Sequence, residues 1–381
     1  MTVRLLVISH RVPELPIRNG YDLHVHHVLC HLAALGVDIT MVVAAGADSV
    51  PAHEAFDVVR APAGHVSVSF YRRIGHGGFG LRHTIRRHLE RAGADAVMVM
   101  SGRLACSAGG VLIPKILDAI DATHLNIQAS VGMTSGLAHV KERVREFTMR
   151  RSMRLHYPSF DAVVAVTPED ARAIETVVTG LQVKDIPNGV AVEDFASRGS
   201  AARVPGRLVF TGAMDYPPNE AAAEFLTRTV LPQVREDAPH AHVHLVGRDP
   251  SSRVRSLGDL PGVTVVGEVP AMEPHLSTAD VFACAMLSGT GIKNKLLEAM
   301  ANGLPSVITP VASRGLAVEH GRHVLISDPE EFATTILVLL SDASLRDRLR
   351  TEGRSYVDEN HSWRSVAERY LEVIADVVEG V

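Results

Sequence analysis

Cysteine and aromatic residues are scarce in this chain of 381 residues. Its three cysteines, Cys30, Cys106 and Cys284, lie in apolar sequence and lack the paired spacing of a metal site. This pattern favours buried, free thiols in a reducing compartment over the disulfide framework of a secreted protein. Aromatic residues make up only 4% of the chain and give no clear platform on which a ligand ring could stack.

Long apolar runs are also missing. No run approaches the ~18–20 apolar residues that a membrane-spanning helix needs. The N-terminal stretch at residues 3–10 is too short and wrongly flanked for a signal peptide, so we expect it to form a first strand. We therefore expect a cytoplasmic protein that is at most peripheral to the inner face of the plasma membrane.

A net charge of −5 argues against general nucleic-acid binding, but the charge is unevenly distributed. Residues 1–155 carry 18 Lys and Arg against 12 Asp and Glu, whereas the remainder carries 20 against 31. The basic N-terminal half is the side that we expect to face an anionic ligand or a membrane surface. Two arginine clusters are either solvated helix faces or docking sites, at Arg82, Arg86, Arg87 and Arg91 and at Arg150, Arg151 and Arg154.

Apolar runs of strand length alternate with amphipathic stretches of helix length, in two successive series. Runs that are apolar on both faces and separated by helices indicate buried parallel sheets with right-handed crossovers, and two such series predict an α/β protein with two doubly wound, Rossmann-like domains. The first series comprises Arg4–Ser9, Asp38–Val43, Ala96–Met100, Lys115–Asp118, Ala162–Val166 and Val183–Ile186. The second comprises Leu208–Thr211, His242–Val246, Val263–Val266, Val281–Ala285, Ser306–Thr309 and Val324–Ile326.

A polar stretch rich in Pro, Gly and Ser separates the two series at residues 187–206. We place the N-terminal domain at residues 1–190, a linker at 191–205 and the C-terminal domain at 206–361. The last segment, 362–381, has helical periodicity and forms a separate terminal helix.

The most informative segment is residues 288–305, in which a Gly-rich turn leads into an apolar helix. Lys293 and Lys295 follow the turn, and Glu298 lies one turn deeper. Backbone N–H groups and the helix dipole at such a turn attract anions, and two lysines add positive charge for a diphosphate. A carboxylate there could accept hydrogen bonds from ribose hydroxyls. The segment predicts a nucleotide-diphosphate site, and the alternative is an ordinary βα turn with solvated lysines.

Several separate motifs occur in one order along the chain. They are IPNGVAVEDF at 186–195, FTGAMDYPPNEAA at 210–222, LVGRDPSSRVRSL at 245–257, PGVTVVGEV at 261–269, KNKLLEAMANGLPSVIT at 293–309, HVLISDPEEFA at 323–333 and HSW at 361–363. In this order they resemble the retaining glycosyltransferases of the GT-B fold (glycosyl transferases group 1 type), closest to bacterial exopolysaccharide-type sugar transferases. The resemblance spans most of the chain and is dense from about Val183 onward.

The resemblance implies two Rossmann-like domains that face a central cleft, with the C-terminal helix crossing back to the first domain. It also implies that the N-terminal domain binds the acceptor and that the C-terminal domain binds a nucleotide-sugar donor. Ligands of doubly wound sheets bind beyond the carboxyl ends of the strands, which agrees with a site in that cleft. The chain has no Asp-x-Asp motif, so we expect no metal cofactor and cationic side chains in its place.

By resemblance, Lys293 and Lys295 hold the donor pyrophosphate and neutralise the leaving group, and Glu298 holds the donor ribose. Gly212 opens a turn that should admit the donor phosphate, a role that is compatible with a simple tight turn. Arg248 either reaches the donor base or phosphate or is a surface arginine.

The chain departs from the family at Thr290, where many relatives carry a glutamate that contacts the transferred sugar. Thr290 and Gly291 are predicted to contact the donor, but the choice of sugar stays open. Leu287 and Arg314 stand where the closer subgroup often has an arginine and a glutamate. These differences fit either an altered donor or a loss of activity.

On the acceptor side, Gly20 matches one glycine of a family pair and should let the backbone approach the donor phosphate. Asp118, Asp121 and His124 follow a strand at the edge expected to face the cleft. We predict that Asp121 and His124 join the two lysines in the catalytic site, where they position the acceptor or the sugar.

Two further patterns are weaker. His24, His27 and His31 share one helical face beside Cys30, and a cleft-lining or core helix is favoured over a metal site because no carboxylate completes a ligand set. GHGGFG at 75–80 matches a dinucleotide fingerprint but does not follow the first strand and lacks its ribose carboxylate, so a flexible acceptor-side loop is favoured.

Together these features predict a metal-independent transferase that moves a sugar from a nucleotide-diphosphate sugar to a glycan, lipid-linked or small-molecule hydroxyl. The resemblance implies that it retains the anomeric configuration. A nucleotide-sugar epimerase that uses Asp118 and Asp121 is one alternative. A catalytically inactive, nucleotide-binding partner subunit is the other, and Thr290 is its best support.

Overall fold

A computed structural model describes residues 3–13, 17, 20–43, 57–60, 85, 87–89, 93–132, 135–195, 203–289 and 292–380. The chain divides into two compact units, and each is described here by itself. Unit 1 comprises Met1–Gly189 with Trp363–Val381, and unit 2 comprises Val190–Ser362. Both units are built on parallel sheets with helices, so the predicted α/β class with two Rossmann-like domains is confirmed.

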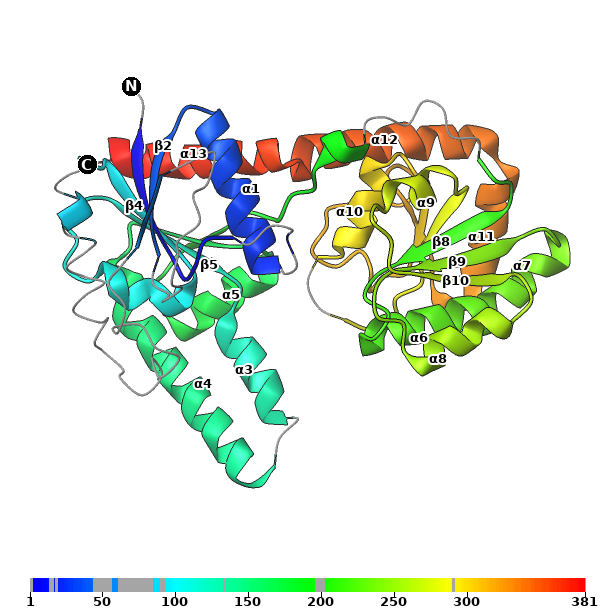
Figure 1. Ribbon diagram of the computed structural model, residues 1–381, viewed down its shortest axis with the longest axis horizontal. Helices are drawn as coiled ribbons and strands as arrows, with labels where there is room; N and C mark the ends of the chain where they lie inside the picture. The colour runs from blue at the N-terminus through cyan, green and yellow to red at the C-terminus, as the bar shows by residue number, and fades with distance from the viewer. Residues whose placement is uncertain are drawn as a thin grey trace. The chain divides into compact units, whose positions relative to one another are not determined.

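Unit 1 contains a seven-stranded sheet in the order β3-β2-β1-β4-β5-β6-β7, and every strand pair is parallel (Figure 1). The central strands β1, β4, β5 and β6 are buried on both faces, which explains their continuous apolar runs. They are β1 (Arg4–Ser9), β2 (Asp38–Val43), β3 (Asp57–Arg60), β4 (Ala96–Met100), β5 (Lys115–Ile120), β6 (Ala162–Ala165) and β7 (Val183–Asp185). The helices are α1 (Gly20–Ala34), η2 (Gly102–Ala108), α3 (Thr123–Gly132), α4 (Gly136–His156), η3 (Tyr157–Ser159), α5 (Pro168–Val177) and α13 (Trp363–Glu379).

The terminal helix α13 packs in unit 1 although it is the last element of the chain. Trp363 stacks on His27 of α1 with ring centroids 4.7 Å apart. The same indole lies against Gly189, where an added Cβ would come within 2.6 Å of the ring. These contacts, all within unit 1, hold the C-terminal helix α13 in the first domain.

Unit 2 contains a six-stranded parallel sheet in the order β10-β9-β8-β11-β12-β13. Its strands are β8 (Arg207–Thr211), β9 (His242–Val246), β10 (Val263–Gly267), β11 (Val281–Cys284), β12 (Ser306–Ile308) and β13 (Leu325–Ile326). Its helices are η4 (Val192–Phe195), α6 (Pro217–Phe225), η5 (Leu226–Val230), α7 (Leu231–Asp237), α8 (Ser252–Ser256), η6 (Leu257–Asp259), α9 (Glu273–Ser277), α10 (Asn294–Ala301), η7 (Pro329–Glu331), α11 (Phe332–Ser341) and α12 (Ala343–His361).

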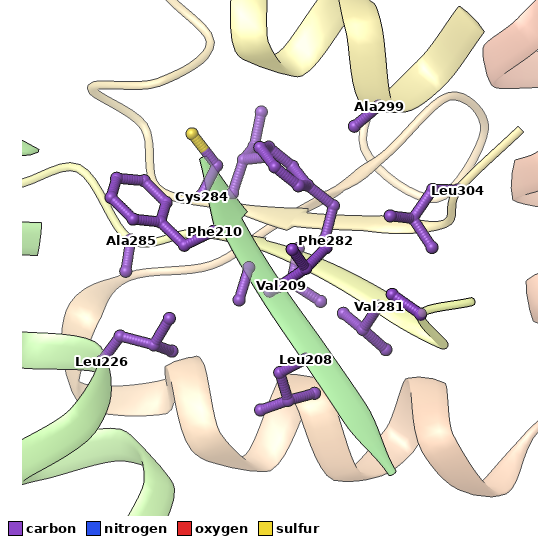
Figure 2. Packing of buried hydrophobic residues seen from close by; sticks show 14 of the residues in the cluster. Leu208, Val209, Phe210, Leu226, Val281, Phe282, Cys284, Ala285, Ala299 and Leu304 are labelled. Carbon is purple, nitrogen blue, oxygen red and sulfur yellow. The ribbon is translucent and has the colours of Figure 1, made fainter. Parts of the chain in front are cut away.

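The core of unit 2 is centred on β8 and β11, whose side chains are buried except for that of Arg207. Figure 2 shows Phe210 and Phe282 from these neighbouring strands packed with Leu226 and with Ala299 of α10. This packing fixes the position of α10 against the carboxyl ends of the central strands, which is where the predicted site begins.

Two details differ from the sequence prediction. Strand β3 was not predicted, because the short run Asp57–Arg60 is half charged and falls between weakly patterned stretches. Residues 191–195, predicted as part of the linker, belong to unit 2, because Val192 and Phe195 are buried in its core. Among the described helices, none is both long and apolar enough to cross a membrane.

Candidate functional site

The carboxyl ends of β8 and β9 approach each other through two glycines. The Gly212 N–H donates to the Val246 carbonyl at 3.1 Å. An added Cβ on Gly247 would lie 1.7 Å from the Gly212 carbonyl oxygen, and both glycines have φ of +153°. Only glycine fits this backbone crossing. This close crossing of the two backbones leaves space beyond the strand ends. The turn predicted at Gly212 needs such space to admit a phosphate.

A cavity of about 500 Å³ opens beyond these strand ends, entirely within unit 2. Its wall joins the turn after β8, the start of α6 and the start of α10. The predicted residues Gly212, Arg248, Lys293, Lys295 and Glu298 all line it, and residues that the sequence reasoning did not single out include Thr211, Asn219, Met272 and Met286.

Lys295 lies on the first turn of α10 and points its ammonium across the cavity to α6. Its Nζ donates to Asn219 Oδ1 at 2.5 Å and lies 4.5 Å from the centroid of the Phe210 ring. Burial lowers the pKa of Lys295 to about 8, against the opposing effects of Cys284 and Glu298. Near pH 7 the amine is still mostly protonated, and an anion that entered the cavity would raise its pKa again.

Lys293 is the N-cap residue of α10, and only 7% of its surface is exposed. Burial lowers the pKa of Lys293, and the nearby Arg314 guanidinium lowers it further. Two buried cations at a helix N-terminus make a region of strongly positive potential, because the helix dipole adds to their charge. Such a region suits a dianionic or trianionic diphosphate.

Glu298 lies one helical turn after Lys295 on the same face of α10. Burial raises the pKa of Glu298 to about 7, although the Lys295 ammonium opposes the shift. In the cavity wall this carboxyl group is available to polar groups of a ligand. Glu298 thus lies one turn deeper in α10 than Lys295, and its ribose contact stays a prediction.

Asn219 connects the two walls of the cavity. Its side chain is buried, and Nδ2 donates to the Ala213 carbonyl at 2.8 Å while Oδ1 accepts from Lys295. This fixed orientation makes Asn219 a positioning residue for the lysine. Its place in the Pro-Pro-Asn start of α6 is the sequence signal that could have identified it.

The remaining predicted donor residues have different surroundings. Arg248 lines the cavity, but 60% of its side chain is exposed and it approaches Asp249 at 3.4 Å, so the position fits both earlier interpretations. Thr290 and Gly291 lie outside the described residues. Thr211 contributes a buried hydroxyl that makes no hydrogen bond to any residue the structure describes.

In unit 1, Asp118 lies in a buried network instead of an open edge. One of its oxygens accepts from Tyr370 at 2.9 Å and lies 2.7 Å from His24 Nε2, while His24 Nδ1 meets Asn188 at 2.7 Å. Burial alone would lower the pKa of His24, but the Asp118 carboxylate raises it overall. This network connects α1, β5 and α13 through hydrogen bonds. Asp118 is fully buried in it and has no exposed surface that a substrate could contact.

Asp121 and His124 lie at the start of α3. Asp121 Oδ1 accepts from the Thr123 hydroxyl at 2.7 Å. His124 is only 2% exposed, and burial together with the Arg150 guanidinium lowers its pKa to about 4. In unit 1 taken alone, Asp121 is therefore accessible while His124 faces the interior, and their predicted catalytic roles stay predictions.

A polar cluster that the sequence reasoning missed lies at the carboxyl ends of β1 and β4. Tyr21 Oη lies 2.7 Å from Ser9 Oγ, and His10 Nε2 lies 3.3 Å from Ser101 Oγ. Ser101 has φ of +115°, a strained conformation for a residue with a side chain. Burial lowers the pKa of His10 to about 4, so this imidazole is neutral near pH 7.

Gly20 begins α1, and no atom of the described residues lies within 4 Å of the place where its Cβ would be. Close packing inside unit 1 therefore does not require glycine at this position. The alternative metal site on α1 has no support in the described residues, which contain no group of three or more His, Cys, Asp or Glu side chains placed to hold an ion. The GHGGFG segment at 75–80 lies outside the described residues.

Two family models match the chain in succession. Residues 18–194 match Glycosyltransferase Family 4, and residues 205–342 match Glycosyl transferases group 1. These matches support the predicted relationship to GT-B glycosyltransferases of group 1. The retaining mechanism and the closeness to exopolysaccharide-type enzymes stay predictions.

Among curated proteins, the chain is similar to a phosphatidyl-myo-inositol mannosyltransferase of Mycobacterium leprae. The two are 27% identical over 217 residues, which cover 54% of this chain and 57% of the relative. The chain therefore spans little more than half the length of that curated relative.

Two solved structures have the same architecture over their full length. Sucrose-phosphate synthase from Thermosynechococcus elongatus matches with a TM-score of 0.68 at 17% identity and covers 100% of both chains. HepE from Anabaena in complex with UDP matches with a TM-score of 0.66 at 12% identity, over 99% of this chain and 100% of the other. Identities this low establish the fold alone, which is the two-domain GT-B arrangement of Rossmann-like sheets.

Proposed function

We propose that this chain transfers a sugar from a nucleotide-diphosphate sugar to an acceptor hydroxyl. The observation that carries the proposal is the cavity at the start of α10, where two buried lysines and a buried carboxyl group lie at the N-cap and on the first two turns of the helix. Both family models describe glycosyltransferases, and the similar HepE structure contains UDP.

The cavity suits the chemistry of the leaving group. When the bond between the sugar C1 and the phosphate oxygen breaks, negative charge develops on the departing nucleoside diphosphate. Lys293 and Lys295 would neutralise that charge in place, and Asn219 would hold Lys295 in position. Glu298 would accept hydrogen bonds from the ribose hydroxyls and so fix the nucleotide.

In the proposed retaining course, the acceptor attacks from the same face as the leaving group departs. The acceptor oxygen forms the new bond to C1, and its proton passes to the leaving phosphate. The reaction requires no metal, because the two lysines and the N-terminus of α10 supply the positive charge. The names of the relatives favour a glycan or lipid-linked acceptor, since one is a phosphatidyl-myo-inositol mannosyltransferase and another a lipopolysaccharide core glycosyltransferase.

A coupled assay for free nucleoside diphosphate tests this proposal. The full chain is incubated with a panel of UDP-, GDP- and ADP-sugars, with and without a mixture of glycan and lipid-linked acceptors. We expect release of the nucleoside diphosphate that depends on acceptor, together with a glycosylated product. Binding of nucleotide without any acceptor-dependent release would instead support the inactive partner subunit, and conversion of the donor without acceptor would support the epimerase.

A further inference from the structure

Helix α4 of unit 1 carries an exposed apolar stripe that the proposed reaction does not use. Figure 1 shows α3 and α4 as a pair of helices that extends away from the sheet of this unit. Five apolar side chains of α4 are exposed: Leu155 (55%) near its C-terminus, and four closer to its start, Leu137 (90%), Val140 (59%), Val144 (57%) and Phe147 (66%). The spacing of these four, at three or four residues, places them on one face of the helix.

Positive charge surrounds this stripe. At 100° per residue, Arg151 falls within the stripe, while Lys141 and Arg143 flank it on opposite sides. All three are exposed. A helix with an apolar stripe and Lys or Arg beside it has the pattern of an interfacial helix that lies on a membrane.

Negative charge lies on the other side of α4. Glu142 and Glu146 point away from the stripe, and each is paired with an arginine of the same helix, at 3.3 Å from Arg145 and 3.0 Å from Arg150. The whole segment 123–156 contains six Lys or Arg residues and only these two acidic residues. The exposed face therefore complements an anionic surface.

We propose that the exposed face of α4, formed by Leu137, Val140, Val144 and Phe147 with Lys141, Arg143 and Arg151, docks the protein on an anionic lipid bilayer. The four apolar side chains enter the boundary between headgroups and acyl chains. The three cations contact lipid phosphates. A single helix of this kind gives reversible, peripheral binding that weakens as salt increases.

Co-sedimentation with vesicles tests the proposal. The full chain is mixed with vesicles of phosphatidylcholine alone or with equimolar phosphatidylglycerol, in 0.1 M and 0.5 M NaCl. Two variants test the two parts of the face: Val144→Glu with Phe147→Glu, and Arg143→Glu with Arg151→Glu. Val338→Glu is the matched control, because Val338 is also an exposed apolar residue but lies on α11 of unit 2.

We expect the wild-type chain to bind the phosphatidylglycerol vesicles at least about tenfold more tightly than phosphatidylcholine vesicles, with weaker binding at high salt. Both double variants should lose at least about tenfold in affinity, and the control should bind like the wild type. Equal thermal unfolding of all variants excludes misfolding as the cause. The proposal is wrong if the wild type binds neither vesicle or if Val144→Glu with Phe147→Glu binds normally.

Light scattering in solution tests the remaining alternative, in which the exposed face of α4 is an interface between copies of the chain. If the wild type is a dimer that Phe147→Glu converts to a monomer and neither form binds vesicles, the face is an interface between copies of the chain, and the membrane proposal fails.

Discussion

Lys295 and Glu298 are buried groups of opposite charge on one turn of α10, and each is held away from its ordinary protonation behaviour. Burial brings the pKa of the amine down to about 8 and that of the carboxyl group up to about 7. A cavity that holds such groups costs the folded state stability until a ligand satisfies them. This balance is typical of binding sites.

Replacing Glu298 with Gln should weaken donor binding more than it slows the chemical step. A ribose contact exists in both the ground state and the transition state, so its loss should raise the donor KM more than it lowers kcat. The lost charge-assisted hydrogen bond is worth roughly 1.5–3 kcal/mol. Steady-state kinetics and calorimetry with the bare nucleoside diphosphate measure both effects. Unchanged affinity with a collapsed kcat would move Glu298 to the reacting centre.

The same residue predicts a pH dependence of stability. The folded pKa of about 7 lies above the ordinary value of 4.5, so the folded state binds more protons than the unfolded state between these pH values. Stability from this group is therefore lost as pH rises from 4.5 through 7, by an amount on the order of 2 kcal/mol. Urea unfolding across this range should show a smaller loss for Glu298→Gln. The exposed Glu330→Gln should behave like the wild type, and a common curve for all three proteins would refute the shift.

Sequence reasoning located the lysines and the carboxyl group because one short helix alone sets their spacing. It missed Asn219, which lies 76 residues before its partner Lys295 and meets it only through the tertiary fold. It also treated Asp118 as an edge residue. The network with His24 and Tyr370 depends on a helix from the other end of the chain, which no local pattern could predict.

At the scale of elements, the crossing of β8 and β9 determines the shape of the cavity. The strands were predictable, because β8 is an apolar run buried on both faces and β9 alternates histidine with buried apolar residues. The close contact between Gly212 and Gly247 could not be predicted, because the sequence around each glycine indicates only a turn after the strand. Likewise, η4 fell within the predicted linker because its polar neighbours conceal two buried apolar residues.

Gly247→Ala should destabilise unit 2. The new methyl group would lie 1.7 Å from the Gly212 carbonyl oxygen, so the backbone must move. Losses from such overpacking and backbone strain are about 2–4 kcal/mol. The control is Gly258→Ala, whose Cβ would meet only a Val265 methyl group at an ordinary 3.5 Å. Denaturant unfolding compares the two, and equal stability would contradict the described crossing.

At the scale of the whole molecule, the chain combines two Rossmann-like units with a final helix that returns to the first. This architecture was predictable because two series of strands and a terminal helical segment are visible in the sequence. The acceptor could not be predicted, since Asp118 and His124 are buried by contacts that depend on the fold and Asp121 alone does not define an acceptor.

Activity of the full chain should survive chelation. In the proposed mechanism, Lys293, Lys295 and the N-terminus of α10 would provide the charge that a metal provides elsewhere, so turnover in EDTA should equal turnover without it. The comparison uses one enzyme preparation, assayed with EDTA and then with added Mg²⁺ or Mn²⁺. Complete loss in EDTA that either ion restores would overturn the metal-independent mechanism.

The most direct measurement of the central claim is calorimetric titration of nucleoside diphosphates into the full chain and into Lys295→Met, with Lys184→Met as a control on an exposed lysine of unit 1. The panel contains UDP, GDP, ADP and CDP. We predict that at least one binds the wild type and the control equally, and that Lys295→Met binds it more weakly by about 2–4 kcal/mol, the range for a lost charge-assisted contact in a buried site. Equal binding of that ligand by all three proteins would contradict the placement of the donor site at α10.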